Sequence, residues 1–380
     1  MNTGITHHLF YEQTDKIFTI TLSDKKVIIE NGKVGKTKVT EKEFSTAEEA
    51  KTNFEKKEWE MLKKGFTLRN ENPLTGEPSL HYYVGAGYTG SLAFENTPNG
   101  IYIYKHGWFK TASDQKDFLV LIDARGNLKE TIELPKILAW DIQFNAATNS
   151  MLLDLDHYIF EYEPEHNIFR LLADRGMGTV ASFVAVSKEK IAFATNHNFQ
   201  VRDNGKNILL QQNFDTEIVK GSIPFCATLS KNGKVLALHN KIGEIKVLST
   251  LDGSLLYTIE SDFLMIGQME FTDEDKHLAI NEANSGRRMR YFEVVTGTEL
   301  TYPGLNIPAY SNEVHHFSFN ADQSKLALLQ RTNAYIFDFK NKVLQHHFKI
   351  NHCVKTARPK FIGDLLGFRT DYGCFSLYNV

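Results

Sequence analysis

YIFDFKNKVL, residues 335–344, joins two short apolar strands through a polar turn, and this pattern occurs six times in the chain. The other copies are VLIDARGNL (120–128), YIFEYEPEHNIF (158–169), QVRDNGKNIL (200–209), KVLSTLDGSLL (246–256) and RYFEVVTGTEL (290–300). Equivalent apolar residues are spaced 39, 41, 46, 45 and 44 residues apart, at Leu121, Phe160, Val201, Val247, Phe292 and Ile336. A repeat of this length is typical of β-propeller blades with four strands each.

Two further features complete the predicted ring. LSKNGKVLAL (229–238), FTDEDKHLAI (271–280) and FNADQSKLAL (319–328) precede the later copies and predict the first two strands of a blade. The chain ends at 363–380 with only the inner strands of a last blade, and LHYYVGAG (80–87) is a strand left over before the first. Because an open ring would expose two sheet edges, we expect 80–87 to close it. The fold prediction is mainly β, with a seven-bladed propeller over 80–380.

The repeats resemble those of the WD-repeat family of β-propellers. Asp123, Asp203 and Asp338 occupy the aspartate position of that family, although no tryptophan precedes them and the chain has no Gly-His pair. The dipeptide Trp140-Asp141 falls at the start of a blade, where we interpret it as coincidence.

The first 66 residues predict a separate small α+β domain. Strands are expected at 17–22 and 26–30, and a helix at 44–66, where Ser45 and Glu48 would form a capping box and Gly65 would end the helix. Residues 67–79, TLRNENPLTGEPS, are predicted to be the linker.

This N-terminal segment resembles a WGR domain, a module found in poly(ADP-ribose) polymerases and in bacterial proteins. In the polymerases, the Trp and Arg of the naming triplet approach nucleic acid, but here the triplet is Asn31-Gly32-Lys33. Asparagine cannot stack on a base and lysine lacks the bidentate fork of arginine, so specific base reading is not expected. Non-specific phosphate contact through Lys33, Lys36 and Lys38 is one interpretation, and a solvated hairpin whose lysines protect a sheet edge is the other.

In a WD-like ring, the loops between the second and third strands of each blade share one face with the loops between blades. Arginine and aromatic residues are common in binding hot spots, and loops on rigid scaffolds often carry binding sites. The competing interpretation is ordinary loop composition. The candidate partner-binding residues on this face are His106, Trp108, Lys110, His197, His239, Arg287, Arg288, Arg331, Arg369 and Tyr372.

Composition and motifs limit the other classes of function. A formal net charge of −3 gives no global attraction to DNA or to an anionic membrane. The three cysteines are predicted to be reduced thiols, the start of the chain lacks the pattern of a signal peptide, and a cytoplasmic, bacterial, monomeric protein is expected. Gly85, Gly87 and Gly90 match a dinucleotide fingerprint, but a strand follows them instead of a helix.

No catalytic residue, metal ligand or cofactor is predicted from the sequence. His315-His316 and His346-His347 are adjacent on predicted strands, so each pair points to opposite faces and cannot chelate one ion. The leading hypothesis is a non-enzymatic scaffold that binds a protein or an acidic partner. The alternatives are a regulator that binds nucleic-acid phosphates through the lysine hairpin, and a hydrolase or isomerase with its site in the propeller channel.

Overall fold

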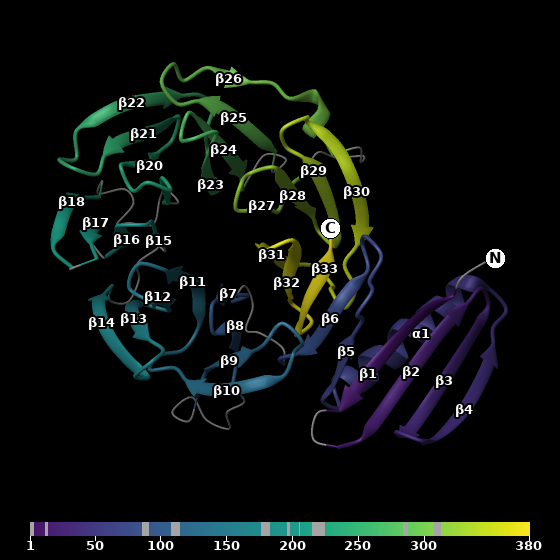
Figure 1. Ribbon diagram of the computed structural model, residues 1–380. Helices are drawn as coiled ribbons and strands as arrows, with labels where there is room; N and C mark the ends of the chain where they lie inside the picture. Colours follow the sequence, from purple (N-terminus) through teal and green to yellow (C-terminus); the bar gives the residue numbers. More distant parts are fainter. Residues whose placement is uncertain are drawn as a thin grey trace.

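The computed structural model describes residues 4–11, 14–85, 91–107, 115–175, 183–195, 198–204, 206–214, 225–283, 288–307 and 313–380. Nearly all regular structure in these residues is antiparallel β-sheet, arranged as a ring with a smaller unit at its rim (Figure 1). One α-helix, α1 (Ala47–Leu62), and one short 3-10 helix, η2 (Pro303–Leu305), occur in the described part. No helix in that part is long and apolar enough to cross a membrane.

Six four-stranded sheets form blades of the ring, each running from an innermost first strand to an outermost fourth strand. Blades 1 to 3 are β7 (Phe94–Thr97), β8 (Gly100–Lys105), β9 (Phe118–Ile122), β10 (Leu128–Glu133); β11 (Ala139–Asn145), β12 (Ser150–Leu155), β13 (Tyr158–Glu163), β14 (Ile168–Asp174); and β15 (Val184–Val186), β16 (Lys190–Ala194), β17 (Asn198–Asp203), β18 (Ile208–Asn213). Blades 4 to 6 are β19 (Cys226–Leu229), β20 (Val235–Lys241), β21 (Glu244–Ser249), β22 (Leu255–Glu260); β23 (Ile266–Thr272), β24 (His277–Glu282), β25 (Met289–Glu293), β26 (Glu299–Leu300); and β27 (His316–Phe319), β28 (Lys325–Gln330), β29 (Asn333–Asp338), β30 (Val343–Lys349).

The repeated sequence pattern corresponds to the hairpin of the third and fourth strands in each of these blades. In three of these hairpins, an aspartate at the turn accepts a hydrogen bond from an asparagine side chain. Asp123 accepts from Asn127, and Asp203 accepts from Asn207 in the same way. Asp338 likewise binds Asn341, three residues on. The aspartates therefore hold the outer turns as Asx-type caps, which explains their recurrence without a tryptophan.

A nine-stranded sheet closes the ring and continues beyond it. Its strands are, in spatial order, β31 (Ala357–Ile362), β32 (Leu365–Thr370), β33 (Cys374–Asn379), β6 (Pro78–Tyr83), β5 (Phe66–Arg69), β1 (Ile5–Tyr11), β2 (Lys16–Ser23), β3 (Lys26–Lys33) and β4 (Lys36–Glu43). β33 pairs with β6, with Phe375 opposite Tyr82 and Ser376 opposite His81. Hydrogen bonds between a strand near residue 80 and the last strand of the chain thus close the circle.

The predicted count of seven blades, which included a composite closing blade, is corrected to six. The remaining place in the ring is taken by β31, β32, β33 and β6, but these strands are not an independent blade. β5 pairs with the outer edge of β6, with Leu68 opposite His81, and also pairs with β1. The N-terminal strands therefore extend the closing sheet to nine strands.

The helix α1 packs on the sheet of β1 to β3 through a buried stripe of Ala50, Phe54, Glu58 and Leu62, with Trp59 beside it. Its N-cap differs by one residue from the sequence prediction. The Thr46 hydroxyl accepts from Glu49 N (3.1 Å), and the Glu49 carboxylate accepts from Ser45 N (3.1 Å). The capping residues are therefore Thr46 and Glu49 in place of Ser45 and Glu48. Gly65 has a φ of +91°, the left-handed conformation expected where the helix ends.

Candidate functional site

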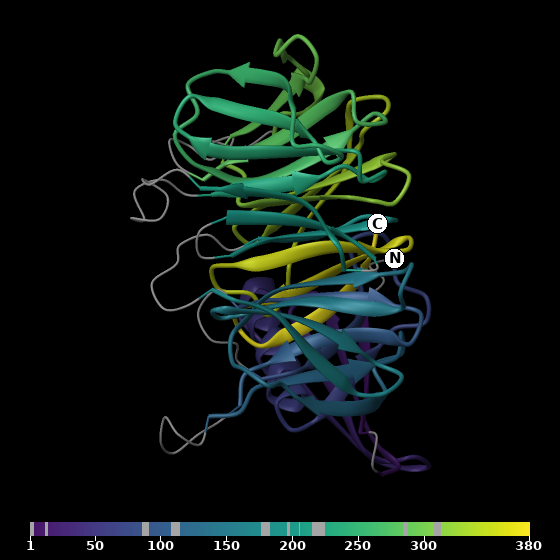
Figure 2. The same cartoon turned by 90° about the vertical axis from the view of Figure 1, so that its left-hand side faces the viewer.

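Seen edge-on, the strands of all blades run between the two faces of the ring (Figure 2). Because each blade is an antiparallel meander, the connections between second and third strands lie on the same face as the connections between blades. We call this the loop face. The described candidate partner-binding residues belong to connections on it or to the strand ends that lead into them.

Four of these candidates, Trp108, Lys110, His197 and Arg287, lie outside the described residues. Two others have fully buried side chains, at 0% exposure for both His239 and Arg369. His239 Nδ1 bonds the Glu244 carbonyl (3.0 Å), and the Arg369 guanidinium donates to the Gly85 carbonyl (2.8 Å). These two residues hold strand ends together in this structure, and their side chains do not reach the surface.

The remaining charged candidates have acidic neighbours. His106 Nδ1 lies 3.0 Å from the buried carboxylate of Asp117. Arg288 donates to Glu282 (2.7 Å), and Arg331 lies 4.0 Å from Glu313. Each of these three described groups therefore lies near a carboxylate of the chain.

Exposed apolar side chains occur on two described parts of the loop face. In blade 4, Ile242 is 53% exposed between β20 and β21, and Leu264 is 46% exposed between β22 and β23. These two connections are tied together, because Gly243 N donates to the Phe263 carbonyl (2.8 Å). Apolar side chains on fixed loops lose little conformational freedom when a partner covers them.

A second exposed apolar pair lies on the closing sheet. Val354, between β30 and β31, and Tyr372, between β32 and β33, are 56% and 45% exposed. The carboxylate of Asp371 accepts from three successive backbone N–H groups, at residues 354 to 356, over 2.8–3.1 Å. One side chain thus holds residues 354 to 356 of this connection.

Part of this surface is already covered by the N-terminal unit. Trp59 of α1 stacks on Tyr372 (ring centroids 4.6 Å apart, interplanar angle 17°) and on His352 (4.9 Å, 25°). It also meets Tyr83 edge-on at 5.3 Å. The helix is therefore packed against the loop face of the closing sheet, and of the two apolar pairs described on this face, the pair in blade 4 is the one that the helix does not cover.

Beside this aromatic contact lies a buried group of one carboxylate and three imidazoles. Glu58 of α1 accepts from His7 Nδ1 through one carboxylate oxygen and from His352 Nε2 (2.7 Å) through the other. His81 Nε2 lies 3.9 Å from the second oxygen, and its Nδ1 bonds Ser376 Oγ (2.7 Å). The side chains of these four residues are 4% exposed or less.

The electrostatics of this group follow from burial and proximity. Burial alone would raise the pKa of Glu58, but His7 and His352 lower it well below its usual range. Burial opposes protonation of His7, yet the Glu58 carboxylate outweighs it and raises the pKa of His7. Burial lowers the pKa of His81 to about 3, so this ring is neutral at pH 7. Glu58, His81 and His352 each offer a ligand atom within 4.8 Å of the others, an arrangement that could hold a metal ion.

Sequence analysis did not predict this group, because its members lie at 7, 58, 81 and 352 with no motif spacing. One signal was present in the helix. Ala50, Phe54, Glu58 and Leu62 follow one another at four-residue steps, so an acid occupies the middle of the stripe that should be buried. A buried carboxylate requires partners, which points to polar residues elsewhere in the chain.

The ring channel holds carboxylates, but described partners neutralise two of them. Glu95 of β7 binds Lys360 of β31 (2.5 Å), and Asp141 of β11 binds Arg358, also of β31 (2.5 Å). Arg358 also donates to the Trp140 carbonyl (2.7 Å). Ion pairs across the innermost strands serve to join blades, and they differ from the convergent unpaired acids or histidines that a hydrolase site in the channel would need.

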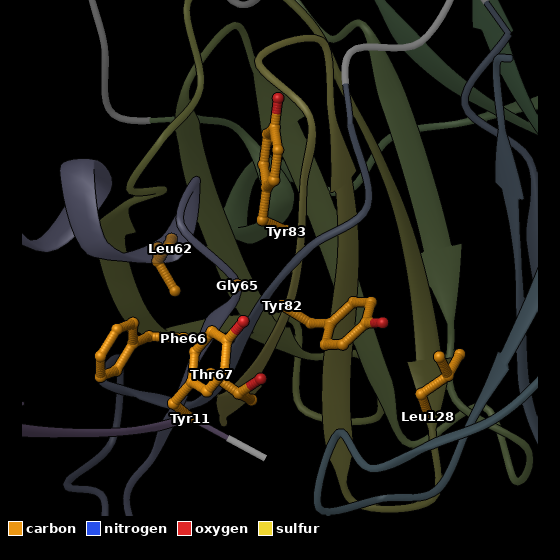
Figure 3. Close-up of a pocket in the computed structure, with 8 residues that line it drawn as sticks. All are labelled: Tyr11, Leu62, Gly65, Phe66, Thr67, Tyr82, Tyr83 and Leu128. Atoms are coloured by element: carbon orange, nitrogen blue, oxygen red, sulfur yellow. The ribbon is translucent and has the colours of Figure 1, made fainter. Parts of the chain in front are cut away.

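A shallow pocket lies between the N-terminal unit and the ring (Figure 3). Its volume is about 160 Å³, below the range of typical small-molecule sites. Three tyrosines contribute to its lining, which is made of Tyr11, Leu62, Gly65, Phe66, Thr67, Tyr82, Tyr83 and Leu128.

The lysine hairpin is formed by β3 and β4. β4 is the edge strand of the closing sheet, and all eight of its residues are exposed. Lys33 lies opposite Lys36, and Asn31 lies opposite Lys38, so alternation places all three lysines on one side of the hairpin. Among the residues that the structure describes, no ion pair involves these three lysines.

Comparison with known proteins identifies the fold and no family. No protein-family model and no curated protein matches the chain. Among solved structures, a chain in the crystal structure of a mitotic checkpoint complex has a TM-score of 0.62 at 10% identity, covering 82% of this chain and 96% of that one. The β-propeller domain of Cps50 (Swd1) from Myceliophteria thermophila has a TM-score of 0.58 at 10% identity, covering 79% and 99%. KlHsv2, with its loop 6CD replaced by a Gly-Ser linker, has a TM-score of 0.51 at 12% identity, covering 73% and 88%. At these identities the likeness shows a WD40-like β-propeller fold.

Proposed function

We propose that this chain is a non-enzymatic scaffold that binds a protein partner through the loop face of its ring. The observation that carries the proposal is the pair of exposed apolar side chains in blade 4, Ile242 and Leu264, on connections held together by backbone hydrogen bonds. Apolar anchors on a rigid support, with charged residues around them, are the usual composition of a protein interface.

The solved structures support a role in protein assembly. One neighbour is a chain in the crystal structure of a mitotic checkpoint complex. A protein partner is favoured over a purely acidic ligand, because Glu282 and Asp262 already compensate the charge of Arg288. The side chain of Arg331 is 73% exposed, so among the described candidate cations it is the one we expect to contact an acidic group of the partner.

We also propose a domain division in which residues 1–66 form a WGR-like unit, 67–79 a linker and 80–380 the propeller. In this division β31, β32, β33 and β6 close the ring in the sheet that continues into the N-terminal unit. The strand-helix arrangement of residues 5 to 62 supports it.

Quantitative affinity capture tests the main proposal. The wild-type chain, the double variant Ile242→Asp/Leu264→Asp and the control Leu251→Asp are immobilised and exposed to lysate of the source cells. Leu251 is 82% exposed in the turn between β21 and β22, on the opposite face. We expect one defined protein retained by wild type and control and reduced at least tenfold by the double variant. Equal retention by all three baits would refute a role for this face.

The second candidate function is non-specific contact with nucleic-acid phosphates through the lysine hairpin. The placement of Lys33, Lys36 and Lys38 on one side of an exposed edge favours it. Three such contacts with duplex DNA predict about a 40-fold loss of affinity between 50 and 200 mM salt. Replacing the three lysines by alanine should abolish binding, whereas replacing the exposed lysines 188, 340 and 355 should not. Absence of DNA binding by the wild-type chain at 50 mM salt would eliminate this candidate.

A further inference from the structure

The buried group of Glu58 and the histidines has a hydrogen-bonding deficit that a cation would remove. His81 is 0% exposed, and its Nε2 has no hydrogen-bond partner within the described part of the chain. That atom lies 3.9 Å from the Glu58 carboxylate, too far for a hydrogen bond. A buried polar atom left without a partner in a native structure often indicates a missing water or ion.

We propose that Glu58, His81 and His352 bind a divalent transition-metal ion of the zinc type. The three ligand atoms are Glu58 Oε1, His81 Nε2 and His352 Nε2, all within 4.8 Å of one another. Ligands at about 2.0–2.1 Å from zinc in a tetrahedral site stand roughly 3.3 Å apart. Side-chain adjustments of about 1–1.5 Å therefore bring the three atoms to bonding distance.

The chemistry of the donors selects the metal. Two imidazole nitrogens and one carboxylate oxygen suit Zn²⁺, whereas Ca²⁺ and Mg²⁺ take oxygen ligands almost exclusively. The carboxylate also balances part of the charge that the ion would bring into a buried position. Three protein ligands leave the fourth place to a solvent molecule.

The groups behind the ligands are arranged as they are around protein-bound zinc. Ser376 Oγ bonds Nδ1 of His81 at 2.7 Å, which holds the ring with Nε2 directed toward Glu58. His7 donates to the carboxylate oxygen of Glu58 that the metal would not use. Such outer contacts orient ligands and typically change metal affinity 10- to 100-fold when removed. His7 is thus a positioning residue.

The site is enclosed and joins three distant parts of the chain. Glu58 comes from α1, His81 from β6, and His352 from the connection between β30 and β31. Their side chains are 4% exposed or less. A bound ion would therefore fasten the N-terminal helix to the closing sheet of the ring.

Metal titration of the full chain, with any affinity tag removed and after treatment with a chelator, tests the proposal. We expect one Zn²⁺ per chain by calorimetry, and visible absorption of four-coordinate Co²⁺ when that ion is substituted. His81→Asn and His352→Asn should each lower the Zn²⁺ affinity at least 100-fold, and His7→Asn about 10- to 100-fold.

His8→Asn is the matched control, because His8 adjoins His7 on β1 but is exposed and bonds only Thr19 among the described hydrogen bonds (3.2 Å). Its Zn²⁺ affinity should equal that of wild type. The proposal is overturned if wild type binds Zn²⁺ no more tightly than the His81 and His352 variants, or if the control loses as much affinity as they do.

A measurement on wild type alone covers the case in which those variants do not fold. X-ray absorption of the Zn²⁺-loaded chain should show about two imidazole nitrogens with oxygen in the remaining places. Sulfur in the coordination shell, or an all-oxygen shell without imidazole, would contradict the assignment.

Discussion

The contact between Trp59 and the loop face predicts that the N-terminal unit and the ring unfold together. Trp59 is 8% exposed and touches three aromatic rings, of His352, Tyr372 and Tyr83, all outside its own helix. The same two parts share a continuous sheet through β5 and β6. Replacing Trp59 by alanine should therefore destabilise both parts at once.

The magnitude follows from the size of the lost contact. Truncating a buried tryptophan to alanine costs about 3–5 kcal/mol. Trp59→Phe keeps one ring in place and loses part of the stacking, worth about 0.5–1.5 kcal/mol for each aromatic pair, so it should cost about 1–2 kcal/mol. For a cooperative unit of this length, 3–5 kcal/mol corresponds to a fall in Tm of about 4–6 °C.

Differential scanning calorimetry in the presence of a chelator measures this without any contribution from bound metal. We expect one endotherm, moved down by about 4–6 °C in Trp59→Ala. The control is Leu74→Ala, at a side chain 70% exposed outside the regular structure, which should change Tm by less than about 1 °C. Two endotherms, with the larger unmoved by Trp59→Ala, would refute the claim that helix and ring form one cooperative unit.

Three further predictions concern single residues of the ring. Burial raises the pKa of Glu270 to about 7, so protonated Glu270 favours the folded state, and this contribution is lost as the pH rises from about 4.5 through 7. The free energy of unfolding of Glu270→Gln in urea should therefore equal that of wild type at pH 4.5 and exceed it by up to about 3 kcal/mol at pH 8. Equal free energies of unfolding at both pH values would contradict this. Asp371→Ala removes the acceptor of three backbone N–H groups. The rate of amide hydrogen exchange at residues 354 to 356 should therefore rise at least tenfold. An unchanged exchange rate would show that other contacts hold this loop. Gly100 has a φ of +133°, and a Cβ at this position would stand 2.3 Å from the Ile122 carbonyl oxygen. Gly100→Ala should therefore lower the free energy of unfolding by more than about 2 kcal/mol, whereas the unobstructed Gly363→Ala should lower it by about 1 kcal/mol. Similar losses in the two variants would show that the backbone conformation alone matters.

The fold could be predicted from the sequence where it depends on local signals that repeat. Each outer hairpin carries an apolar strand, a polar turn and a second strand, and the spacing of these hairpins marks the blades. The merging of the closing sheet with the N-terminal strands left no such signal. Pairing between β5 and β6 joins a short strand at 66–69 to one at 78–83, within the segment where turn residues such as Pro73 and Gly76 predict a linker. Edge pairing between strands depends on three-dimensional placement, which a local pattern does not encode.

The candidate site was predicted less completely, because residue type does not show whether a side chain faces solvent. Arg369 and His239 have the composition of a binding surface, yet both are fully buried at strand ends, where they satisfy carbonyl groups. Ile242 and Leu264 were not singled out, since isolated apolar residues in loops are common. Only the backbone bonds between their two connections show that they share a fixed surface.

The histidine group bears on how the two parts of the molecule act as one. A buried glutamate facing three histidines costs desolvation energy that ordinary apolar residues in the same helix stripe would avoid. The group joins α1 to β6 and to the connection at His352, so we expect it to favour this docking of the helix over others. The same docking places Trp59 over Tyr372 on the loop face. Occupancy of the group by a metal ion would therefore fix how much of the loop face the N-terminal unit covers, and so how much remains for a partner.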